Sequence, residues 1–298
     1  MKEKEDGRLK PLCDIITSPV QLRHFLKDHS LALKKSLGQN FLHDRNIILK
    51  IIKIMDLREN DHLVEVGPGI GTMPVFYLPL IQSALLIEID KGLCSLLEKY
   101  IDLPRVNLLH ANFLKIDLGP YLEKKIQYKF FSNLPYNIAS QIIVKLIDYT
   151  SSFHTMFIMV PDVLYRRIIA IPGSKDYSRF TIMVSSFFRV TRLFSVKKGS
   201  FFPVPQVDSL FLKLTPLSPS LIPHDQKDVL KDFLQILFHA RRKKINSALL
   251  QLSQRFKMPE EKIVSFIRAS QIDPSHRIEQ IPLHKIIFLF KEISFLTS

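Results

Sequence analysis

A β-rich run passes into a glycine turn at His62-Leu63-Val64-Glu65-Val66-Gly67-Pro68-Gly69-Ile70-Gly71. Residues 72–81 follow it directly and can continue as a helix. A strand, a glycine turn and a helix in this order begin an α/β fold. Because glycine has no side chain, the turn lets the backbone approach a ligand and leaves N–H groups free at the start of the helix.

The spacing of the glycines narrows the class of ligand. A dinucleotide-binding fingerprint requires Gly or Ala at the sixth position of G-x-G-x-x-G, and this chain has Thr72 there. The spacing is G-x-G-x-G instead, which points away from a pyrophosphate and towards a nucleoside with an uncharged link. Glycine turns of this kind also occur without a ligand, so the motif by itself leaves a purely structural role open.

Polar residues stand at the carboxyl ends of further predicted strands. Glu88 belongs to the strand predicted over 84–90 and lies about twenty residues beyond the first glycine, where an acid accepts ribose hydroxyls. Asn112 follows the strand predicted over 106–110 and is placed to reach an adenine edge. Open α/β sheets bind ligands at this edge, so these positions converge on one site. The alternative for Glu88 is a solvated strand end.

An unusual polar turn, Asn133-Leu134-Pro135-Tyr136-Asn137, follows the strand predicted over 128–132. Pro135 has no N–H and biases the preceding residue to extended geometry, so the carbonyls of the turn can point outward. The amide oxygen of Asn133 and the adjacent carbonyl are then two acceptors for one exocyclic NH2, such as N6 of adenine, and Tyr136 can stack on the ring. The alternative is a structural turn in which Asn133 caps the chain and Tyr136 packs on the core.

The composition limits the partners and the compartment. A net charge of +14 and a pI near 9.7 favour a polyanion such as RNA, DNA or an acidic membrane face. The N-terminus lacks a signal peptide, and no stretch of about 18 apolar residues predicts a membrane span. Cys13 and Cys94 lie far apart without a C-x-x-C spacing, which indicates neither a disulfide framework nor a zinc site. A protein of the reducing cytoplasm, without a metal, is expected.

Changes in composition divide the chain into three parts. We predict an N-terminal extension over 1–33, an α/β domain over 34–216 and a helical domain over 217–298, which begins with a proline- and serine-rich linker. A fifth strand is predicted over 155–160. Helices are predicted over 19–29, after Asp44, and over 139–149, 225–239, 260–269 and 283–293. Four consecutive cations, 241–244, are predicted to open another helix and to contact nucleic acid by releasing counterions from phosphates.

Several motifs occur together in one order: Gly38-Gln39-Asn40-Phe41-Leu42, the stretch 65–71, the turn 133–137, and Ala240-Arg241-Arg242-Lys243. With them the chain resembles the ribosomal RNA small-subunit adenine dimethyltransferase family over nearly everything after Lys34. The resemblance implies a Rossmann-like class I methyltransferase sheet with a smaller C-terminal all-α domain. It also implies a monomeric enzyme that uses S-adenosylmethionine.

The expected reaction gives N6,N6-dimethyladenosine at two adjacent adenosines. They lie in the 3′-terminal hairpin of 16S rRNA within the small (30S) ribosomal subunit, so a role in small-subunit biogenesis follows.

The resemblance assigns roles to individual residues of this sequence. The residues expected to bind the cofactor are Asn40, Leu42, Gly67, Gly69, Glu88, Asn112 and Asn133. Those expected at the reaction centre are Asn133, Leu134, Pro135, Tyr136 and Phe201, the last in an F-x-P-x-P segment as a wall for a flipped base. Those expected to bind RNA are Lys34, Lys35, Arg241, Arg242, Lys243 and Lys244. Asn112 departs from the pattern, because bacterial members commonly have Asp there.

Three other functions are weighed against this one. A related methyltransferase of large-subunit rRNA shares most cofactor motifs, but such enzymes more often carry Ile where this chain has Leu134, and the cations at 241–244 favour the small subunit. A ribosome-assembly factor whose chemistry is secondary would still bind the particle when catalytically dead. A DNA adenine methyltransferase more often presents an acid where this chain has Asn133.

Overall fold

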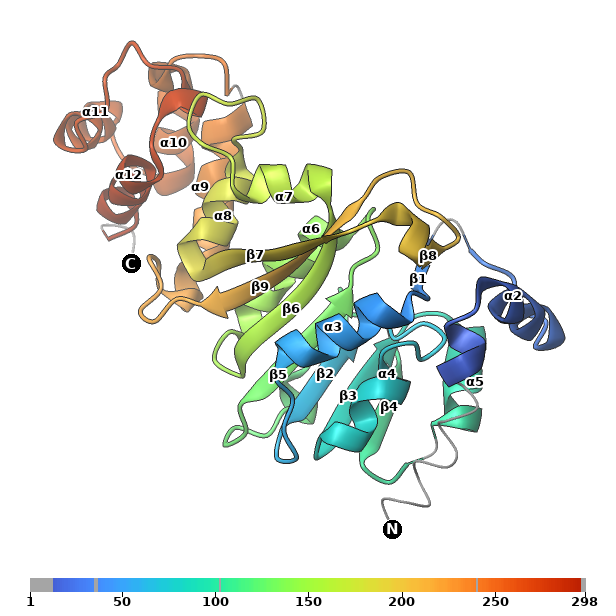
Figure 1. Ribbon diagram of the computed structural model, residues 1–298. Helices are drawn as coiled ribbons and strands as arrows, with labels where there is room; N and C mark the ends of the chain where they lie inside the picture. The colour runs from blue at the N-terminus through green and yellow to red at the C-terminus, as the bar shows by residue number, and fades with distance from the viewer. Residues whose placement is uncertain (1–12, 35–36, 102, 240, 296–298) are drawn as a thin grey trace. The chain divides into compact units, whose positions relative to one another are not determined.

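The computed structural model describes residues 13–34, 37–101, 103–239 and 241–295 and contains a seven-stranded sheet (Figure 1). In spatial order its strands are β4 (Val106–His110), β3 (Ser83–Glu88), β2 (His62–Val66), β5 (Tyr128–Asn133), β6 (Phe153–Pro161), β9 (Ser209–Pro216) and β7 (Phe188–Val196). The pairs from β4 to β6 are parallel, and β9 is antiparallel to β6. The five predicted strands are confirmed. The sequence-based prediction lacks β7 and β9, the strands added at the β6 side of the sheet.

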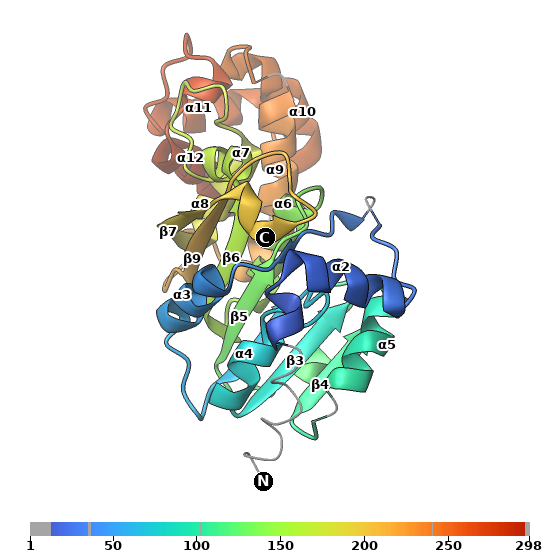
Figure 2. The same cartoon turned by 45° about the vertical axis from the view of Figure 1, so that its right-hand side comes forward.

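Helices cover both faces of this sheet. α3 (Arg45–Met55) and α4 (Pro74–Tyr77) lie on one face, and α6 (Ala139–Leu146) lies on the other (Figures 1 and 2). The carboxylate of Asp44 starts α3 by accepting from the amides of Asn46 at 3.0 Å and Ile47 at 3.2 Å. The helix predicted over 72–81 is shorter than expected, because a 3-10 turn, η2 (Leu78–Leu80), replaces its second half. Pro79 cannot donate an N–H to a continuing α-helix.

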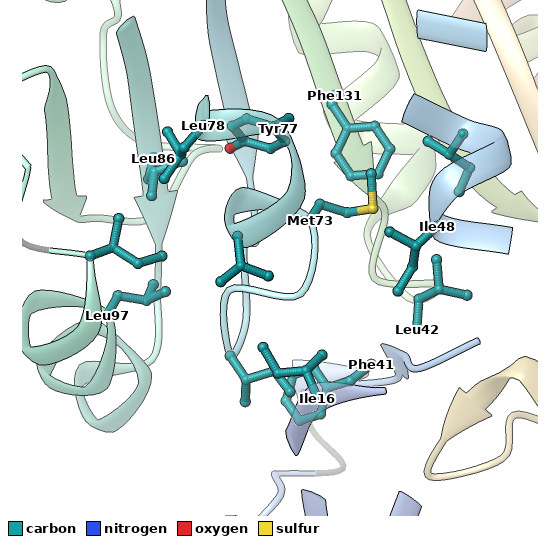
Figure 3. Packing of buried hydrophobic residues seen from close by; sticks show 14 of the residues in the cluster. Ile16, Phe41, Leu42, Ile48, Met73, Tyr77, Leu78, Leu86, Leu97 and Phe131 are labelled. Carbon is teal, nitrogen blue, oxygen red and sulfur yellow. The ribbon is translucent and has the colours of Figure 1, made fainter. Parts of the chain in front are cut away.

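Residues 13–33 of the predicted N-terminal extension contribute to the core, and residues 1–12 lie outside the described residues. α2 (Pro19–Asp28) starts at Ser18, as expected, and buries Leu22, Phe25 and Leu26 in the cluster that also holds residues of the sheet. Figure 3 shows members of this cluster from α3, α4 and β5. The N-terminal segment contributes Ile16 to the same cluster, so residues 13–33 pack on the α/β part instead of forming a separate appendage.

The chain forms two compact units, and their boundaries differ from the predicted domains. One unit comprises Met1–Asp162 and Val190–Pro216, and the other comprises Val163–Arg189 and Leu217–Ser298. The second unit contains α7 (Asp162–Ile168) except for its first residue, α8 (Arg179–Phe187), α9 (Lys227–His239), α10 (Leu249–Phe256), α11 (Glu260–Ala269) and α12 (Leu283–Phe295).

Residues 163–189 therefore group with the C-terminal helices, although the prediction assigns them to the α/β domain. Hydrogen bonds explain this grouping. The amide of Gly173 donates to the carbonyl of Glu279 at 2.7 Å, and the hydroxyl of Tyr177 donates to the carbonyl of Ile281 at 2.9 Å.

A buried cation joins the start of β5 to the end of α3. Nζ of Lys129 donates to the carbonyl of Met55 at 3.2 Å and of Asp56 at 2.6 Å, and it pairs with the carboxylate of Asp61 at 2.7 Å. The side chains of Lys129 and Asp61 are 11% and 18% exposed, so solvent screens this pair little. Removing one partner of a buried pair strongly destabilises the fold, because the remaining charge is left buried without compensation.

We expect Lys129→Met to lower the free energy of unfolding by about 3 kcal/mol, since it leaves the Asp61 carboxylate and two carbonyls without their donor. Urea unfolding followed by circular dichroism measures the change. The matched control is Lys125→Met on an exposed lysine, which should shift the free energy by less than about 0.5 kcal/mol. Equal effects of the two substitutions would contradict a stabilising role for the buried ammonium.

Candidate functional site

A pocket opens at the carboxyl ends of the parallel strands. All of the residues expected to bind the cofactor line it, namely Asn40, Leu42, Gly67, Gly69, Glu88, Asn112 and Asn133. Apolar side chains complete its walls, including Leu37, Phe41, Ile87, Phe113 and Ile138. The structure thus brings together residues that lie up to about ninety positions apart in the sequence, at the edge where open α/β sheets bind ligands.

The glycine turn is shaped by a close approach of the N-terminal segment. Gly69 has φ +62°, and a Cβ there would lie 2.7 Å from Cε1 of Phe41. Phe41 belongs to β1 (Phe41–Leu42), which pairs with β8 (Phe201–Phe202) in a separate two-stranded sheet. Both the left-handed backbone and the packing of the Phe41 ring therefore require glycine at position 69.

Glu88 is anchored at the end of β3. Its Oε1 accepts from the amides of Ile89 at 2.8 Å and Asp90 at 2.9 Å, and its Oε2 accepts from the amide of Gly69 at 3.1 Å. Burial raises the pKa of Glu88, while the amides of Asp90, Gly69 and Ile89 oppose that shift. At 4% exposure Glu88 is not a solvated strand end. A carboxylate has about four acceptor positions, so these three donors leave room for a ligand hydroxyl.

Asn133 ends β5 and faces the pocket. Its Nδ2 donates to the backbone carbonyl of Asn40 at 2.8 Å, which fixes the orientation of the amide. Among the residues that the structure describes, no hydrogen bond reaches Oδ1 of Asn133, so this oxygen remains an acceptor. Leu134 is held in place through its backbone, whose amide donates to the carbonyl of Met159 at 3.1 Å.

The side-chain oxygen of Asn112 accepts a hydrogen bond from its own loop. Oδ1 of Asn112 accepts from the backbone amide of Leu114 at 2.9 Å, which closes a turn after β4. One lone pair of that oxygen and the two hydrogens of Nδ2 remain for a ligand. As an acceptor for an adenine amino group, the Asn112 amide is therefore weaker than a carboxylate, which would have a second free oxygen.

Of the two aromatic residues expected beside the target base, Phe201 differs from the prediction. Phe201 is 1% exposed and belongs to the hydrophobic core, so its ring does not present a face to a base. Side chains alternate along a strand, and the neighbouring Phe202 is half-buried, with the guanidinium of Arg23 5.6 Å from its ring centroid. Tyr136 is also half-buried, and its hydroxyl lies 2.6 Å from Oγ of Ser209. Pro135 lines the pocket directly.

Comparison with known proteins identifies the family. The model of the family described as ribosomal RNA adenine dimethylase matches residues 30–294. The chain belongs to the ribosomal RNA adenine dimethylase family. It is similar to ribosomal RNA small subunit methyltransferase A of Pseudomonas aeruginosa, with 33% identity over 264 residues, 88% of this chain and 94% of the relative. The protein of the same name from Chlorobium phaeobacteroides is 32% identical over 267 residues, 90% of this chain and 96% of the relative.

Solved structures agree with this assignment. A dimethyladenosine transferase from Plasmodium falciparum aligns with a TM-score of 0.68 and 27% identity, covering 82% of this chain and 94% of the other. The 23S rRNA methyltransferase ErmE aligns with a TM-score of 0.59 over 85% of this chain and 99% of the other, and at 22% identity it shows the fold alone. The expected class I methyltransferase fold is confirmed. The protein is an enzyme of the adenine dimethylase family that uses S-adenosylmethionine and acts on ribosomal RNA.

The pocket of this family member fits S-adenosylmethionine. Glu88 offers an anchored carboxylate for ribose hydroxyls, and the apolar walls suit an adenine ring. The hydroxyl of Thr72 lines the pocket and is buried without a hydrogen-bond partner in the described part of the chain. A polar group of a bound cofactor would satisfy such an atom.

The cations expected to bind RNA occupy different environments. Nζ of Lys34 lies 2.9 Å from Oδ2 of Asp90, so its charge is paired within the protein. Lys35 lies outside the described residues. Arg241 donates to the carbonyl of Lys175 at 2.8 Å and lies 3.4 Å from the carboxylate of Glu279, which makes it an internal tie.

Three neighbouring cations remain at the surface. Arg242, Lys243 and Lys244 are exposed and stand in a turn. This run precedes a 3-10 turn, η7 (Ile245–Ala248), and does not open an α-helix as expected. The backbone explains the difference, because Lys244 forms an isolated antiparallel bridge with Arg277.

The part of the chain that the structure describes holds neither a metal centre nor a membrane-spanning helix. Over the ranges that the structure describes, no group of three or more His, Cys, Asp or Glu side chains is arranged to hold a metal ion. In the same part of the chain, no helix has the length and apolar character needed to cross a bilayer.

Glu65 lines the pocket from β2, although it is not among the predicted site residues. It is 2% exposed, and the hydroxyl of Tyr77 donates to its Oε2 at 2.5 Å. Burial raises the pKa of Glu65 to about 8, and the nearby Glu88 carboxyl adds to the shift, against the hydrogen bond from Tyr77. An acid inside an otherwise apolar strand was the sequence signal for this residue.

We expect Glu65→Gln to flatten the pH dependence of stability. Between about pH 5 and 8 the unfolded chain has released the Glu65 proton while the folded chain retains it, so the wild-type free energy of unfolding falls as pH rises. The fall reaches at most about 1.4 kcal/mol per pH unit. Urea unfolding across this range measures it, with Glu98→Gln, on an exposed acid, as the matched control. Identical slopes for wild type and Glu65→Gln would contradict this reasoning.

Proposed function

We propose that the protein methylates N6 of two adjacent adenosines in the 3′-terminal hairpin of 16S rRNA, giving N6,N6-dimethyladenosine. Its substrate is RNA within the small ribosomal subunit in the cytoplasm, and it acts as a monomer without a metal. The names of two relatives, both ribosomal RNA small subunit methyltransferases, support the choice of subunit. The single observation that carries the chemistry is the fixed amide of Asn133, whose oxygen is left as an acceptor.

The chemical problem is the N6 lone pair, which is delocalised into the adenine ring. When bound, S-adenosylmethionine supplies an electrophilic methyl group. Oδ1 of Asn133 and the carbonyl of Leu134 hold the two N6 hydrogens, which favours a pyramidal nitrogen with an available lone pair and fixes its direction. The excess proton leaves N6 for solvent after transfer. No side-chain base is needed, because the nitrogen loses that proton readily once it is alkylated.

The other site residues hold the cofactor and the RNA. Glu88 binds the ribose hydroxyls, and Asn112 meets the edge of the cofactor adenine, supported by their places in the pocket. Tyr136 and Pro135 border the entry of the target base, as expected from the turn that follows β5. The exposed cations Arg242, Lys243 and Lys244 contact RNA phosphates, and the release of counterions from those phosphates favours binding.

One experiment tests the substrate and the position of methylation. The protein is incubated with labelled S-adenosylmethionine and either unmodified small subunits or large-subunit RNA, and the RNA is digested to nucleosides. Labelled dimethyladenosine from small subunits, mapped by primer extension to two adjacent positions, is the expected result. Monomethylation or dimethylation of a single adenine in large-subunit RNA would overturn the proposal. Binding of small subunits without any labelled product would favour an assembly factor.

We expect Asn133→Ala to reduce methyl transfer by at least about 100-fold, because it removes an acceptor that positions the reacting nitrogen. Calorimetric binding of S-adenosylhomocysteine should change much less, so the two readouts separate. Asn107→Ala, on an exposed residue of β4, is the matched control and should leave both unchanged. Equal loss of transfer and of cofactor binding would contradict the role of Asn133.

We expect Asn112→Asp to tighten binding of S-adenosylhomocysteine by about threefold to tenfold. A carboxylate can keep the hydrogen bond from the Leu114 amide and offer a second, charged oxygen to the adenine amino group. Calorimetry measures the dissociation constant, and Asn112→Ala serves as the comparison that should weaken binding. An unchanged constant in both variants would place Asn112 outside the adenine contact.

A further inference from the structure

A short segment before α3 contacts the chain at the ends of two strands, β5 and β3. Residues 37–42, here named the strap, all line the pocket. At one end the strap touches the turn after β5, because a Cβ on Gly38 would lie 3.3 Å from Oδ1 of Asn137 and 3.5 Å from Cβ of Pro135. The next residue, Gln39, reaches Asp90, which follows β3. The strap therefore connects the carboxyl ends of two strands that both supply site residues.

Asp90 holds the strap through a set of contacts that we name the Asp90 clasp. Its Oδ2 pairs with Nζ of Lys34 at 2.9 Å and accepts from Nε2 of Gln39 at 3.2 Å. Oε1 of Gln39 in turn accepts from the backbone amide of Lys34 at 2.8 Å. The clasp thus joins a carboxylate, an ammonium and an amide in a closed ring of contacts, in which Gln39 and Asp90 lie 51 positions apart in the sequence.

The two oxygens of Asp90 serve separate purposes. Oδ1 accepts from the amides of Gly92 at 2.9 Å and Leu93 at 3.4 Å, which caps α5 (Lys91–Tyr100), whereas Oδ2 contacts Lys34 and Gln39. The Lys34 side chain is 54% exposed, so the ion pair alone contributes little, but the Asp90 side chain is only 5% exposed. Loss of a hydrogen-bond partner costs a buried carboxylate more free energy than an exposed one, so the contacts with Lys34 and Gln39 together stabilise the strap.

Backbone groups of the clasp and of the residue next to it contact two predicted site residues, Glu88 and Asn133. The amide of Asp90 donates to Oε1 of Glu88 at 2.9 Å. On the strap, the residue after Gln39 is Asn40, whose carbonyl accepts from Nδ2 of Asn133 at 2.8 Å. A displaced strap would therefore remove the partner that orients the Asn133 amide.

We propose that Asp90 and Gln39 are positioning residues, which fasten the strap over the cofactor and thereby orient the amide of Asn133. The charge of Lys34 acts in this clasp and not on an RNA phosphate. The proposal rests on the proposed roles of Glu88 and Asn133. It predicts that cofactor affinity and the order of the strap both depend on side chains that need not touch the cofactor.

The test uses a double-mutant cycle in the full-length protein. Asp90→Asn keeps an N-cap acceptor for α5 but loses the charge, and Lys34→Met removes the ammonium. Each variant should weaken S-adenosylhomocysteine binding by about tenfold in calorimetry. The double variant should be no weaker than the more affected single one, because both changes remove one interaction. Gln39→Leu, which leaves the cap of α5 untouched, should also weaken binding.

Hydrogen exchange supplies a readout that does not depend on activity. Amides of residues 37–42 should exchange faster in the three single variants, both with and without S-adenosylhomocysteine. The matched controls alter an exposed pair in the same unit, Asp56→Asn and Arg58→Met, whose side chains lie 3.1 Å apart. These controls should leave the dissociation constant and the exchange of the strap at wild-type values.

Two outcomes overturn the proposal. If Asp90→Asn and Gln39→Leu leave both binding and strap exchange unchanged, Asp90 only caps α5. If the effects of Asp90→Asn and Lys34→Met add fully, the two side chains do not act as one clasp. The proposed function fails separately, through full methyl transfer by Asn133→Ala, and that result would leave the measured dependence of cofactor binding on the clasp intact.

Discussion

The hydrogen bond from Nδ2 of Asn133 to the carbonyl of Asn40 is the constraint on which the site depends. An amide can present either a donor or an acceptor, and only the acceptor suits an amino group. By occupying Nδ2, the strap carbonyl leaves Oδ1 for a ligand. The backbone of a segment distant in sequence thus decides the chemistry of a side chain at the end of β5. The packing of Gly38 against the turn after β5 holds that carbonyl at the required place.

The two buried acids of the pocket differ in the hydrogen-bond donors that surround them. Glu88 receives three backbone amides, which stabilise its charged form against the cost of burial. Burial raises the pKa of both acids, but Glu65 receives only one hydroxyl, from Tyr77, and its pKa rises to about 8. The pocket consequently places a hydrogen-bonded carboxylate at the end of β3, where hydroxyls are expected, beside an acid that readily stays neutral. Amide donors, more than distance from solvent, distinguish the two.

Local sequence patterns predicted the strands and most residues of the pocket. They did not predict contacts between residues that are distant in the sequence. The strand before the glycine turn, Glu88 and Asn133 follow from apolar runs that end in polar residues, because parallel strands align their carboxyl ends. The sequence could not decide whether Phe201 or Phe202 faces the core, since both are aromatic and alternation only says that one does. Nor does any local signal pair Asp90 with the strap. Arg241 likewise sits in a basic run, yet its partner Glu279 comes from a later segment.

A neutral acceptor also suits a reaction that occurs twice on one nitrogen. In the proposed reaction N6 carries two hydrogens before the first transfer, one for Oδ1 of Asn133 and one for the Leu134 carbonyl. Afterwards one hydrogen remains, so one acceptor must go without a donor while the added methyl takes up space. An unpaired neutral oxygen in a partly dry site costs less free energy than an unpaired carboxylate, which would have to be solvated or protonated. An amide at position 133 therefore keeps the second transfer accessible, where an acid would favour release after the first.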